Sequence, residues 1–256
     1  MKTLKNLFFG ILLFIAAVIA LAYAFNYQHL FNAIALTYLK GETSATIDDG
    51  VDFPSRNIEK GVAQPWQKDS LYNKTSLPKN IVDNLKSTNS ASFLVIKDGK
   101  LVHEEYFGEY KPTTQTNSFS MAKAFTVMLM GAAIEDQKIE SENQKFADFY
   151  PNFNEVEHGN ELTLRDLAAM EAGYYWDEDY RNPFLQNPRI YYGKNMAEAL
   201  LKSPQFEAKP GSRFEYQSGA TQLLGFAIRK AVNVPLSAYA SQKLWKPLGM
   251  ESDAYW

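Results

Sequence analysis

The pattern of apolar and polar positions separates an uncharged N-terminal run from a longer segment of mixed periodicity. Residues 7–25 carry no charge, and Lys2 and Lys5 precede them. A helix rises about 1.5 Å per residue, so a run of this length nearly matches a hydrocarbon core of about 30 Å. The pattern therefore predicts one N-terminal transmembrane helix, with residues 1–27 as a membrane anchor or signal segment.

The charges on either side of this run predict its orientation. Lysines precede it, whereas Glu42, Asp48 and Asp49 follow it, which favours a cytoplasmic N-terminus by the positive-inside rule. The alternative is a cleaved signal peptide, because residues 20–24 contain small-residue cleavage patterns. The run is long for a signal peptide, which favours an uncleaved anchor. In both cases the remaining chain is expected outside the cytoplasm, on the membrane or in the periplasm.

A β-hairpin is predicted where the main domain begins. Two β-prone runs, residues 91–97 and 100–107, are joined by Asp98-Gly99, which is a strong hairpin signal. The preceding residues 28–90 mix short apolar stretches with turn residues and are predicted to form a connecting arm. Residues 91–256 are then the main domain.

Helical signals dominate the chain after the hairpin. An apolar helix is expected from Ser120 to about Ile134, and Thr163 with Asp166 predicts a capping box for residues 164–170. Further helices fit residues 195–201, 220–232 and 236–244. A hairpin followed by several helices predicts an α+β fold class.

Composition excludes several functions. The 256 residues include 26 basic and 29 acidic residues with a net charge of −3, so the chain offers no electrostatic footprint for nucleic acid. The absence of cysteine excludes disulfides, thiolate metal sites and a cysteine nucleophile. His29, His103 and His158 lack the His-Glu-x-x-His spacing of zinc hydrolases. We therefore expect neither a metal nor another cofactor.

Ser120-Met121-Ala122-Lys123 is the most informative chemical pattern. Residues three apart share a helix face, which lets the Lys123 amine reach the Ser120 hydroxyl. Serine is a poor nucleophile unless an adjacent base takes its proton. The apolar residues 124–130 follow directly and would help to remove water from the lysine. The pattern predicts a covalent serine hydrolase.

A structural interpretation of the same pattern is also open. Ser120 could simply cap a core helix, with Lys123 pointing into solvent. The chain matches the pattern a second time at Ser76 and Lys79, where Ser76 is better interpreted as the N-cap of a helix with Pro78 in its first turn. The four-residue pattern therefore needs support from the rest of the chain.

That support comes from the order of the motifs between Phe93 and Met250. The hairpin, the Ser-x-x-Lys helix and a Leu-Thr-Leu-Arg-Asp-Leu helix are followed by Pro-Gly-x-x-Phe-x-Tyr-x-Ser at residues 210–218. This ordered set resembles the serine β-lactamase and penicillin-binding-protein superfamily, in which Ser-x-x-Lys carries the nucleophile. It is most similar to the class C β-lactamase-like branch. Residues 38–44 and 176–180 resemble aminohexanoate-dimer hydrolases within that branch.

The resemblance implies a β-lactamase/transpeptidase-like fold, which combines an antiparallel sheet with a helical subdomain. It implies Ser120 as the acylated nucleophile, Lys123 as its base partner and Tyr216 as a phenol that relays the proton. Ser218 stands where the family has asparagine. Ser218 is accordingly predicted to orient substrate, and the alternative is that it caps the helix beginning near Ala220.

Residues 174–192, which lie between the Leu-Thr-Leu-Arg-Asp-Leu helix and the motif at residues 210–218, are rich in aromatic side chains. This stretch is predicted to form one wall of the pocket, with Tyr174, Tyr175 and Trp176 as substrate-binding residues. The alternative is that these aromatics pack a long loop onto the helices. Asp177, Glu178 and Asp179 could attract a cationic end of a substrate, but an acidic run is more often a solvated loop. The aromatic residues of this stretch are Tyr174, Tyr175, Trp176, Tyr180, Tyr191 and Tyr192.

The resemblance also implies a third motif, Lys-Thr-Gly or His-x-Gly on a strand. No residues after Tyr216 match it, so we expect the C-terminal strands to be missing and the chain to be the N-terminal part of a longer enzyme. The leading hypothesis is an exported serine hydrolase that cleaves a small-molecule amide or ester, rather than a β-lactam, through an acyl-enzyme. The alternative is a catalytically silent, membrane-anchored binding module of the same fold.

Overall fold

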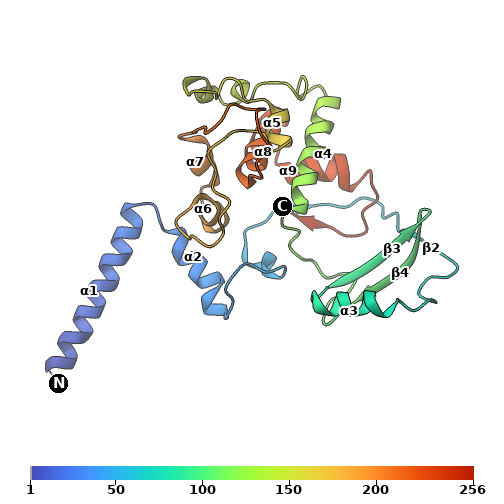
Figure 1. Ribbon diagram of the computed structural model, residues 1–256, viewed down its shortest axis with the longest axis horizontal. Helices are drawn as coiled ribbons and strands as arrows, with labels where there is room; N and C mark the ends of the chain where they lie inside the picture. Colours follow the sequence, from blue (N-terminus) through green and yellow to red (C-terminus); the bar gives the residue numbers. More distant parts are fainter. Residues whose placement is uncertain (1) are drawn as a thin grey trace. The chain divides into compact units, whose positions relative to one another are not determined.

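The computed structural model describes residues 2–256 and divides into two compact units (Figure 1). The first, called here the helical unit, combines the chain up to Asp52 with Phe119–Val234. The second, called here the sheet unit, combines Phe53–Ser118 with Pro235–Trp256. Each unit is therefore built from two separate stretches of sequence.

The predicted N-terminal apolar helix is present as α1 (Lys2–Ala24). Thr3–Ala24 has a mean hydropathy of 2.7 in its most apolar window, and none of that window is buried in the protein. By length and composition α1 can cross a membrane, although a signal sequence has the same properties. The short helix α2 (His29–Leu36) follows and packs against α6 (Gln186–Tyr192) within the helical unit.

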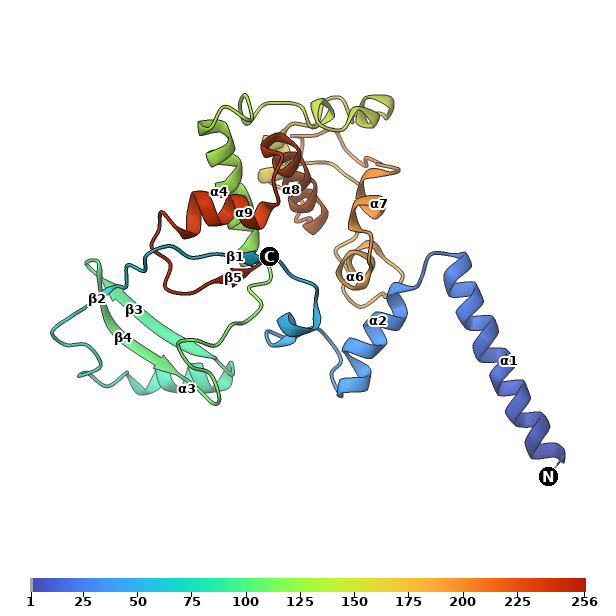
Figure 2. The same ribbon diagram turned by 180° about the vertical axis from the view of Figure 1, so that it is seen from behind.

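The core of the helical unit lies where α4 (Met121–Glu135) and α5 (Leu164–Ala168) pack on α8 (Ser218–Val232). These helices lie close together in both views (Figures 1 and 2). Leu129 of α4, Leu167 of α5 and Leu224 of α8 are each 0% exposed. Burial of such a side chain is worth about 1.5–3 kcal/mol. This packing fixes α4 and α5 against α8 in a common core.

The remaining elements of the helical unit are short. The predicted helix 195–201 is present as α7 (Met196–Leu201), and the side chain of Asn195 caps it by accepting a hydrogen bond from the Glu198 N–H. Helix α8 begins at Ser218, two residues before the predicted start. The 3₁₀ turns of this unit are η1 (Tyr38–Lys40), η2 (Asp49–Asp52), η3 (Phe146–Asp148) and η4 (Pro151–Glu155).

The predicted capping box of α5 is confirmed. Thr163 Oγ1 accepts a hydrogen bond from the Asp166 N–H at 3.1 Å, and Asp166 Oδ2 accepts one from the Thr163 N–H at 2.9 Å. The helix ends at Ala168, earlier than predicted, because Met170 adopts a left-handed conformation with φ of 59°.

Replacing Thr163 by Ala is expected to destabilise the protein by about 1 kcal/mol, because it removes the side-chain acceptor of an N-cap. The loss should lower the melting temperature by about 2–4 °C, as is usual for a chain of this size. Thermal unfolding followed by circular dichroism measures it, with Thr113→Ala on the exposed loop as the matched control. An unchanged melting temperature would contradict the role of the capping box.

The predicted hairpin is confirmed in the sheet unit. Strands β3 (Ser92–Lys97) and β4 (Lys100–Tyr106) pair antiparallel, with Ser92 opposite Tyr106. Asp98 and Gly99 have φ of 49° and 72°, the two positive values that a type I′ turn requires. Strand β2 (Gln67–Lys68) adds to β4 in parallel, giving the order β2-β4-β3 (Figure 1).

A second, two-stranded sheet joins the two stretches of the sheet unit. Strand β1 (Asn57–Ile58) pairs antiparallel with β5 (Ala254–Tyr255), and helix α9 (Leu236–Ala240) packs on β1. The predicted helix 236–244 is thus α9 continued by a π-helical turn at Ser241–Trp245. Residues 28–90, predicted as a connecting arm, supply β1, β2 and helix α3 (Lys79–Ser87).

The prediction that Ser76 caps α3 is wrong. The N-cap of α3 is Pro78, and Lys79 is its first residue. Proline locks its own φ near −65° and restricts the residue before it to extended conformations, so the helix begins directly after Pro78.

Candidate active site

Ser120 lies at a sharp entry into α4. It occupies the N-cap position with φ of −65° and ψ of −13°. The preceding Phe119 has φ of 45°, a left-handed conformation that is strained by about 1–3 kcal/mol for a bulky residue. The Ser120 side chain is exposed, and in the described structure it forms no capping hydrogen bond with the helix. The capping interpretation of Ser120 therefore has no support in the geometry.

Two side chains approach the Ser120 hydroxyl. Lys123 Nζ donates a hydrogen bond to Ser120 Oγ at 3.2 Å, from one turn further along α4. The Tyr216 hydroxyl donates to the same oxygen at 2.7 Å, although Tyr216 is 96 residues away in sequence. The structure thus brings together the three residues that the sequence predicted as nucleophile, base partner and proton relay.

Lys123 and Tyr216 also contact each other. Lys123 Nζ lies 5.3 Å from the centroid of the Tyr216 ring, which is within the range of a cation–π interaction. Lys123 is half-buried, and Tyr216 is 41% exposed. The Lys123 amine, the Tyr216 phenol and the Ser120 hydroxyl therefore form a closed triangle of polar groups.

The position of Ser120 also has an electrostatic consequence. The start of α4 is the positive end of the helix dipole, equivalent to about half a positive charge. This potential stabilises negative charge that develops near Ser120. Nucleophilic attack by Ser120 on a carbonyl would place negative charge at this point.

The segment that carries Tyr216 is held by the residues that follow it. Gln217 is 1% exposed, and its side-chain Nε2 donates to the Tyr174 carbonyl at 2.6 Å. Gly219 lies under the Trp176 indole, where an added Cβ would come within 2.4 Å of the ring. These contacts fix the first turn of α8 against residues 174–176.

The predicted substrate-binding aromatics divide into two groups. Tyr174 is 5% exposed and its hydroxyl donates to the Leu200 carbonyl at 3.0 Å, and Trp176 is 4% exposed. Both pack in the core of the helical unit, which was the alternative interpretation. Tyr175, with 39% exposure, is open to solvent and remains a predicted substrate contact.

The structure surrounds Glu178 with hydrogen-bond donors that sequence reasoning missed, because the sequence placed this residue in an acidic run that could attract a cationic substrate. Its Oε2 accepts hydrogen bonds from the Ser218 N–H at 2.8 Å and from Trp176 Nε1 at 2.6 Å. Its Oε1 accepts from Ser218 Oγ at 2.6 Å and from the Tyr180 hydroxyl. In the sequence, only the Trp-x-Glu-x-Tyr spacing of residues 176–180 could have pointed to these contacts. Ser218 therefore does not cap α8, because its hydroxyl is directed to Glu178.

The surroundings of Glu178 shift its acidity. Burial alone would raise the pKa of the carboxyl, but hydrogen bonds from Ser218, Tyr180 and Trp176 outweigh it and hold the pKa below the ordinary value of 4.5. Burial and the hydrogen bond to Glu178 raise the pKa of the Tyr180 phenol to about 12. Glu178 is thus an ionised acceptor and Tyr180 a protonated donor at neutral pH.

The lowered pKa of Glu178 predicts a pH-dependent stability. A carboxylate with a depressed pKa in the folded state contributes stability above its ordinary pKa and loses it as the pH falls through the folded value. We expect the free energy of unfolding of wild type to exceed that of Glu178→Gln at neutral pH. This difference in stability should shrink as the pH falls through the lowered pKa of Glu178. Urea unfolding at a series of pH values, followed by tryptophan fluorescence, measures it. If the difference in stability between the two proteins does not depend on pH, Glu178 is not the ionised hydrogen-bond acceptor described above.

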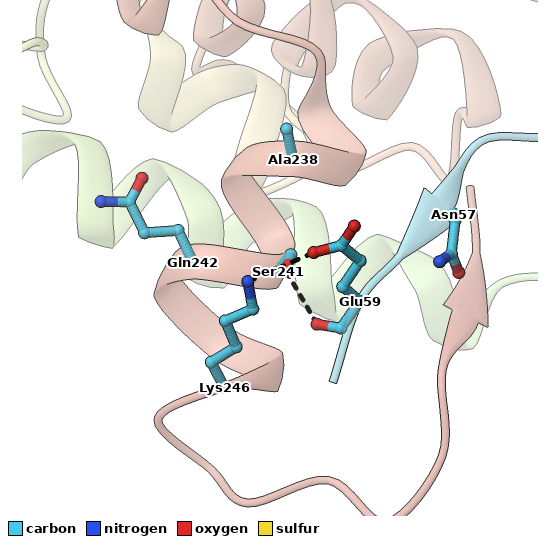
Figure 3. Close-up of a pocket in the computed structure, with 6 residues that line it drawn as sticks. All are labelled: Asn57, Glu59, Ala238, Ser241, Gln242 and Lys246. Atoms are coloured by element: carbon cyan, nitrogen blue, oxygen red, sulfur yellow. Dashed lines mark hydrogen bonds and ion pairs between the residues drawn. The ribbon is translucent and has the colours of Figure 1, made fainter. Parts of the chain in front are cut away.

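Within residues 2–256, no group of three or more His, Asp or Glu side chains is arranged to hold a metal ion. A cavity of about 250 Å³ lies in the sheet unit, beside the π-helical turn (Figure 3). There Ser241 Oγ donates to the Glu59 carbonyl at 2.7 Å, and Lys246 Nζ contacts Glu59 Oε2 at 3.3 Å. None of the predicted site residues lines this cavity, whose lining is Asn57, Glu59, Ala238, Ser241, Gln242 and Lys246.

Comparisons with known proteins find a matching family and several relatives of this chain. A family model described as Beta-lactamase matches residues 78–256. A protein of Escherichia coli (strain K12) named as a D-alanyl-D-alanine carboxypeptidase is 24% identical over 181 residues, which cover 63% of this chain and 42% of that protein. A protein of the same name from Salmonella typhimurium is 23% identical over 186 residues, which cover 65% of this chain and 43% of that protein. The chain therefore spans less than half the length of these curated relatives.

Solved structures show the fold. A Bacillus anthracis protein described as a 6-aminohexanoate-dimer hydrolase has a TM-score of 0.66 at 21% identity, covering 90% of this chain and 61% of that one. A Bacteroides dorei protein described as a beta-lactamase has a TM-score of 0.55 at 20% identity, and the match covers 67% of this chain and 50% of that chain. These similarities confirm the predicted β-lactamase/transpeptidase-like fold.

Proposed function

This chain belongs to the beta-lactamase family, and we propose on that premise that it is a serine hydrolase that forms an acyl-enzyme on Ser120. The observation that carries the proposal is the pair of hydrogen bonds on Ser120 Oγ, from Tyr216 at 2.7 Å and Lys123 at 3.2 Å. A serine hydroxyl held between two groups that can exchange protons has the arrangement that nucleophilic catalysis requires.

In the proposed acylation step, Ser120 Oγ attacks the carbonyl carbon of the substrate. The proton of the Ser120 hydroxyl passes at the same time to the deprotonated member of the Tyr216–Lys123 pair. The carbonyl π electrons move to the oxygen, where the positive end of α4 stabilises the resulting oxyanion. When the tetrahedral intermediate collapses, the bond to the leaving amine or alcohol breaks. The leaving group takes the transferred proton, and the acyl group stays on Ser120.

In the proposed deacylation step, the same groups act on water. Lys123 or Tyr216 takes a proton from a water molecule as its oxygen attacks the acyl carbon. The carboxylic acid leaves, and Ser120 Oγ regains a proton from the pair. A general acid–base pair of this kind contributes about 10²–10⁴-fold to the rate.

For the substrate we propose an open-chain amide or ester. The names of the relatives, D-alanyl-D-alanine carboxypeptidase and 6-aminohexanoate-dimer hydrolase, both describe cleavage at a linear amide linkage. Tyr175 is the exposed aromatic that supports a contact with the substrate. Ser218 lies two residues after Tyr216 and donates its hydroxyl to Glu178, so we propose that its oxygen contacts the substrate as a hydrogen-bond acceptor.

We further propose that the protein is exported and held at the membrane by α1. The support is an apolar helix at Thr3–Ala24 with a mean hydropathy of 2.7, preceded by lysine. The catalytic unit would then lie outside the cytoplasm. A protease-protection assay on intact spheroplasts tests this location, because an exported domain is digested and a cytoplasmic one is not.

A fluorophosphonate probe tests the proposed function. The probe should label the full-length protein at Ser120, as mapped by peptide mass spectrometry, and should not label Ser120→Ala. Absence of labelling in a protein whose folding is confirmed by circular dichroism would contradict the proposal and favour the catalytically silent binding module.

A further inference from the structure

One half-buried carboxylate links the aromatic loop to the helix that follows Tyr216. Glu178 receives four hydrogen bonds, two from Ser218, one from Trp176 and one from Tyr180. Ser218 is the first residue of α8 and lies two residues after Tyr216. The carboxylate therefore holds the backbone and the side chain of a residue next to the proposed proton relay.

The neighbouring contacts reinforce this attachment. Gln217 donates to the Tyr174 carbonyl at 2.6 Å, and Gly219 packs directly under the Trp176 ring. Three consecutive residues, 217–219, are thus attached to residues 174–178. We call these two segments together the α8 clamp. With the clamp closed, the backbone after Tyr216 cannot shift without breaking several buried contacts at once.

We propose that Glu178 is a positioning residue that sets the Tyr216 hydroxyl against Ser120 by closing the α8 clamp. The inference rests on the proposed function, in which Tyr216 relays the proton of Ser120. Glu178 does not touch Ser120, and it acts through the backbone of Ser218 and Tyr216. A misplacement of about 1 Å in a catalytic group can cost about 100-fold in rate, so this restraint matters for turnover.

Glutamate suits this task because both of its oxygens are acceptors. An ionised carboxylate accepts on two oxygens, whereas a glutamine side chain has one acceptor and a donor NH₂ group. At position 178 all four contacts come from donors, so the NH₂ group of glutamine would face two O–H or N–H donors. Glu178→Gln therefore keeps the size of the side chain but loses two of the four hydrogen bonds that position 178 accepts.

The test is a double-mutant cycle on the full-length protein with p-nitrophenyl acetate. We expect Glu178→Gln to lower kcat by roughly 10- to 100-fold, with KM changed less than about twofold, because the reacting groups are displaced while binding is retained. In a Tyr216→Phe background, the same substitution should change kcat less than about twofold. The Tyr216 hydroxyl is then absent, so Glu178 has no hydroxyl to position, and the effects of the two substitutions are not additive. Asp177→Asn, at the exposed neighbouring carboxylate, should leave kcat unchanged.

A second measurement does not depend on turnover. Hydrogen exchange followed by mass spectrometry should show faster exchange in the peptide containing residues 214–222 for Glu178→Gln than for Asp177→Asn. If Glu178→Gln gives no soluble protein, Ser218→Ala removes a single hydrogen bond of the clamp and should give the same pattern with a smaller loss.

The outcomes separate this inference from the proposed function. An equal loss of kcat in both backgrounds would show a general structural role for Glu178 and overturn the inference, as would an unchanged kcat. If the wild-type protein neither turns over the ester nor labels at Ser120, the proposed function itself fails and the positioning role fails with it. The exchange measurement then still reports whether Glu178 closes the clamp.

Discussion

Replacing Ser120 by Ala is expected to lower kcat/KM for a p-nitrophenyl ester by roughly 10³-fold or more, as the loss of a catalytic nucleophile does in other serine hydrolases. The reason is that the Ser120 oxygen is the only atom at which the hydrogen bonds of Tyr216, at 2.7 Å, and Lys123, at 3.2 Å, converge in the described structure. Without it, neither group has a nucleophile to deprotonate, and no acyl-enzyme can form.

The matched control for this experiment is Ser118→Ala, at an exposed serine two residues earlier. The control should retain the wild-type rate, because Ser118 is not part of the proposed site. Both variants should keep the wild-type circular dichroism spectrum, since neither side chain is buried. Full activity in Ser120→Ala would mean that another residue carries the chemistry.

Replacing Tyr216 by Phe is the second large effect. The substitution removes only the hydroxyl, and we expect kcat to fall by roughly 10²–10⁴-fold, the usual contribution of a general acid–base group. The ring stays in place, so its contact with Lys123 at 5.3 Å and the local packing are retained. The expected loss therefore appears in kcat, with KM little changed, in steady-state assays with the same ester.

Tyr38→Phe is the control for the Tyr216 variant, because Tyr38 is 67% exposed and lies in the turn η1. This control should match wild type within about twofold, as is usual for surface substitutions. If Tyr216→Phe also retains the wild-type rate, Lys123 alone would have to serve as the proton acceptor, and the relay role of Tyr216 would be wrong.

Local signals explain why much of the fold could be predicted. The type I′ turn at Asp98 and Gly99, the capping box at Thr163 and the apolar run of α4 each depend on residues close in sequence. Such features follow from turn chemistry, capping and periodicity. The juxtaposition of Ser120 and Tyr216, 96 residues apart, came instead from the order of motifs in a known family.

Long-range packing explains what could not be predicted. The pairing of Asn57 with Tyr255 joins distant segments, and neither strand is longer than two residues. Glu178 lies in an acidic run that is typical of a solvated loop, but its carboxylate meets Ser218, 40 residues further on. Burial of Tyr174 and Trp176 likewise depends on which face of the loop meets α8, and periodicity does not encode that choice in an irregular segment.

The central claim is that Ser120 carries an acyl group during turnover, and trapping that intermediate tests it most directly. The full-length protein is mixed with a slowly deacylating ester, quenched in acid within milliseconds to seconds, and analysed by intact and peptide mass spectrometry. The account predicts one acyl adduct per chain, located on Ser120 and absent from Ser120→Ala. Turnover with no adduct, or with the adduct on another residue, would contradict it.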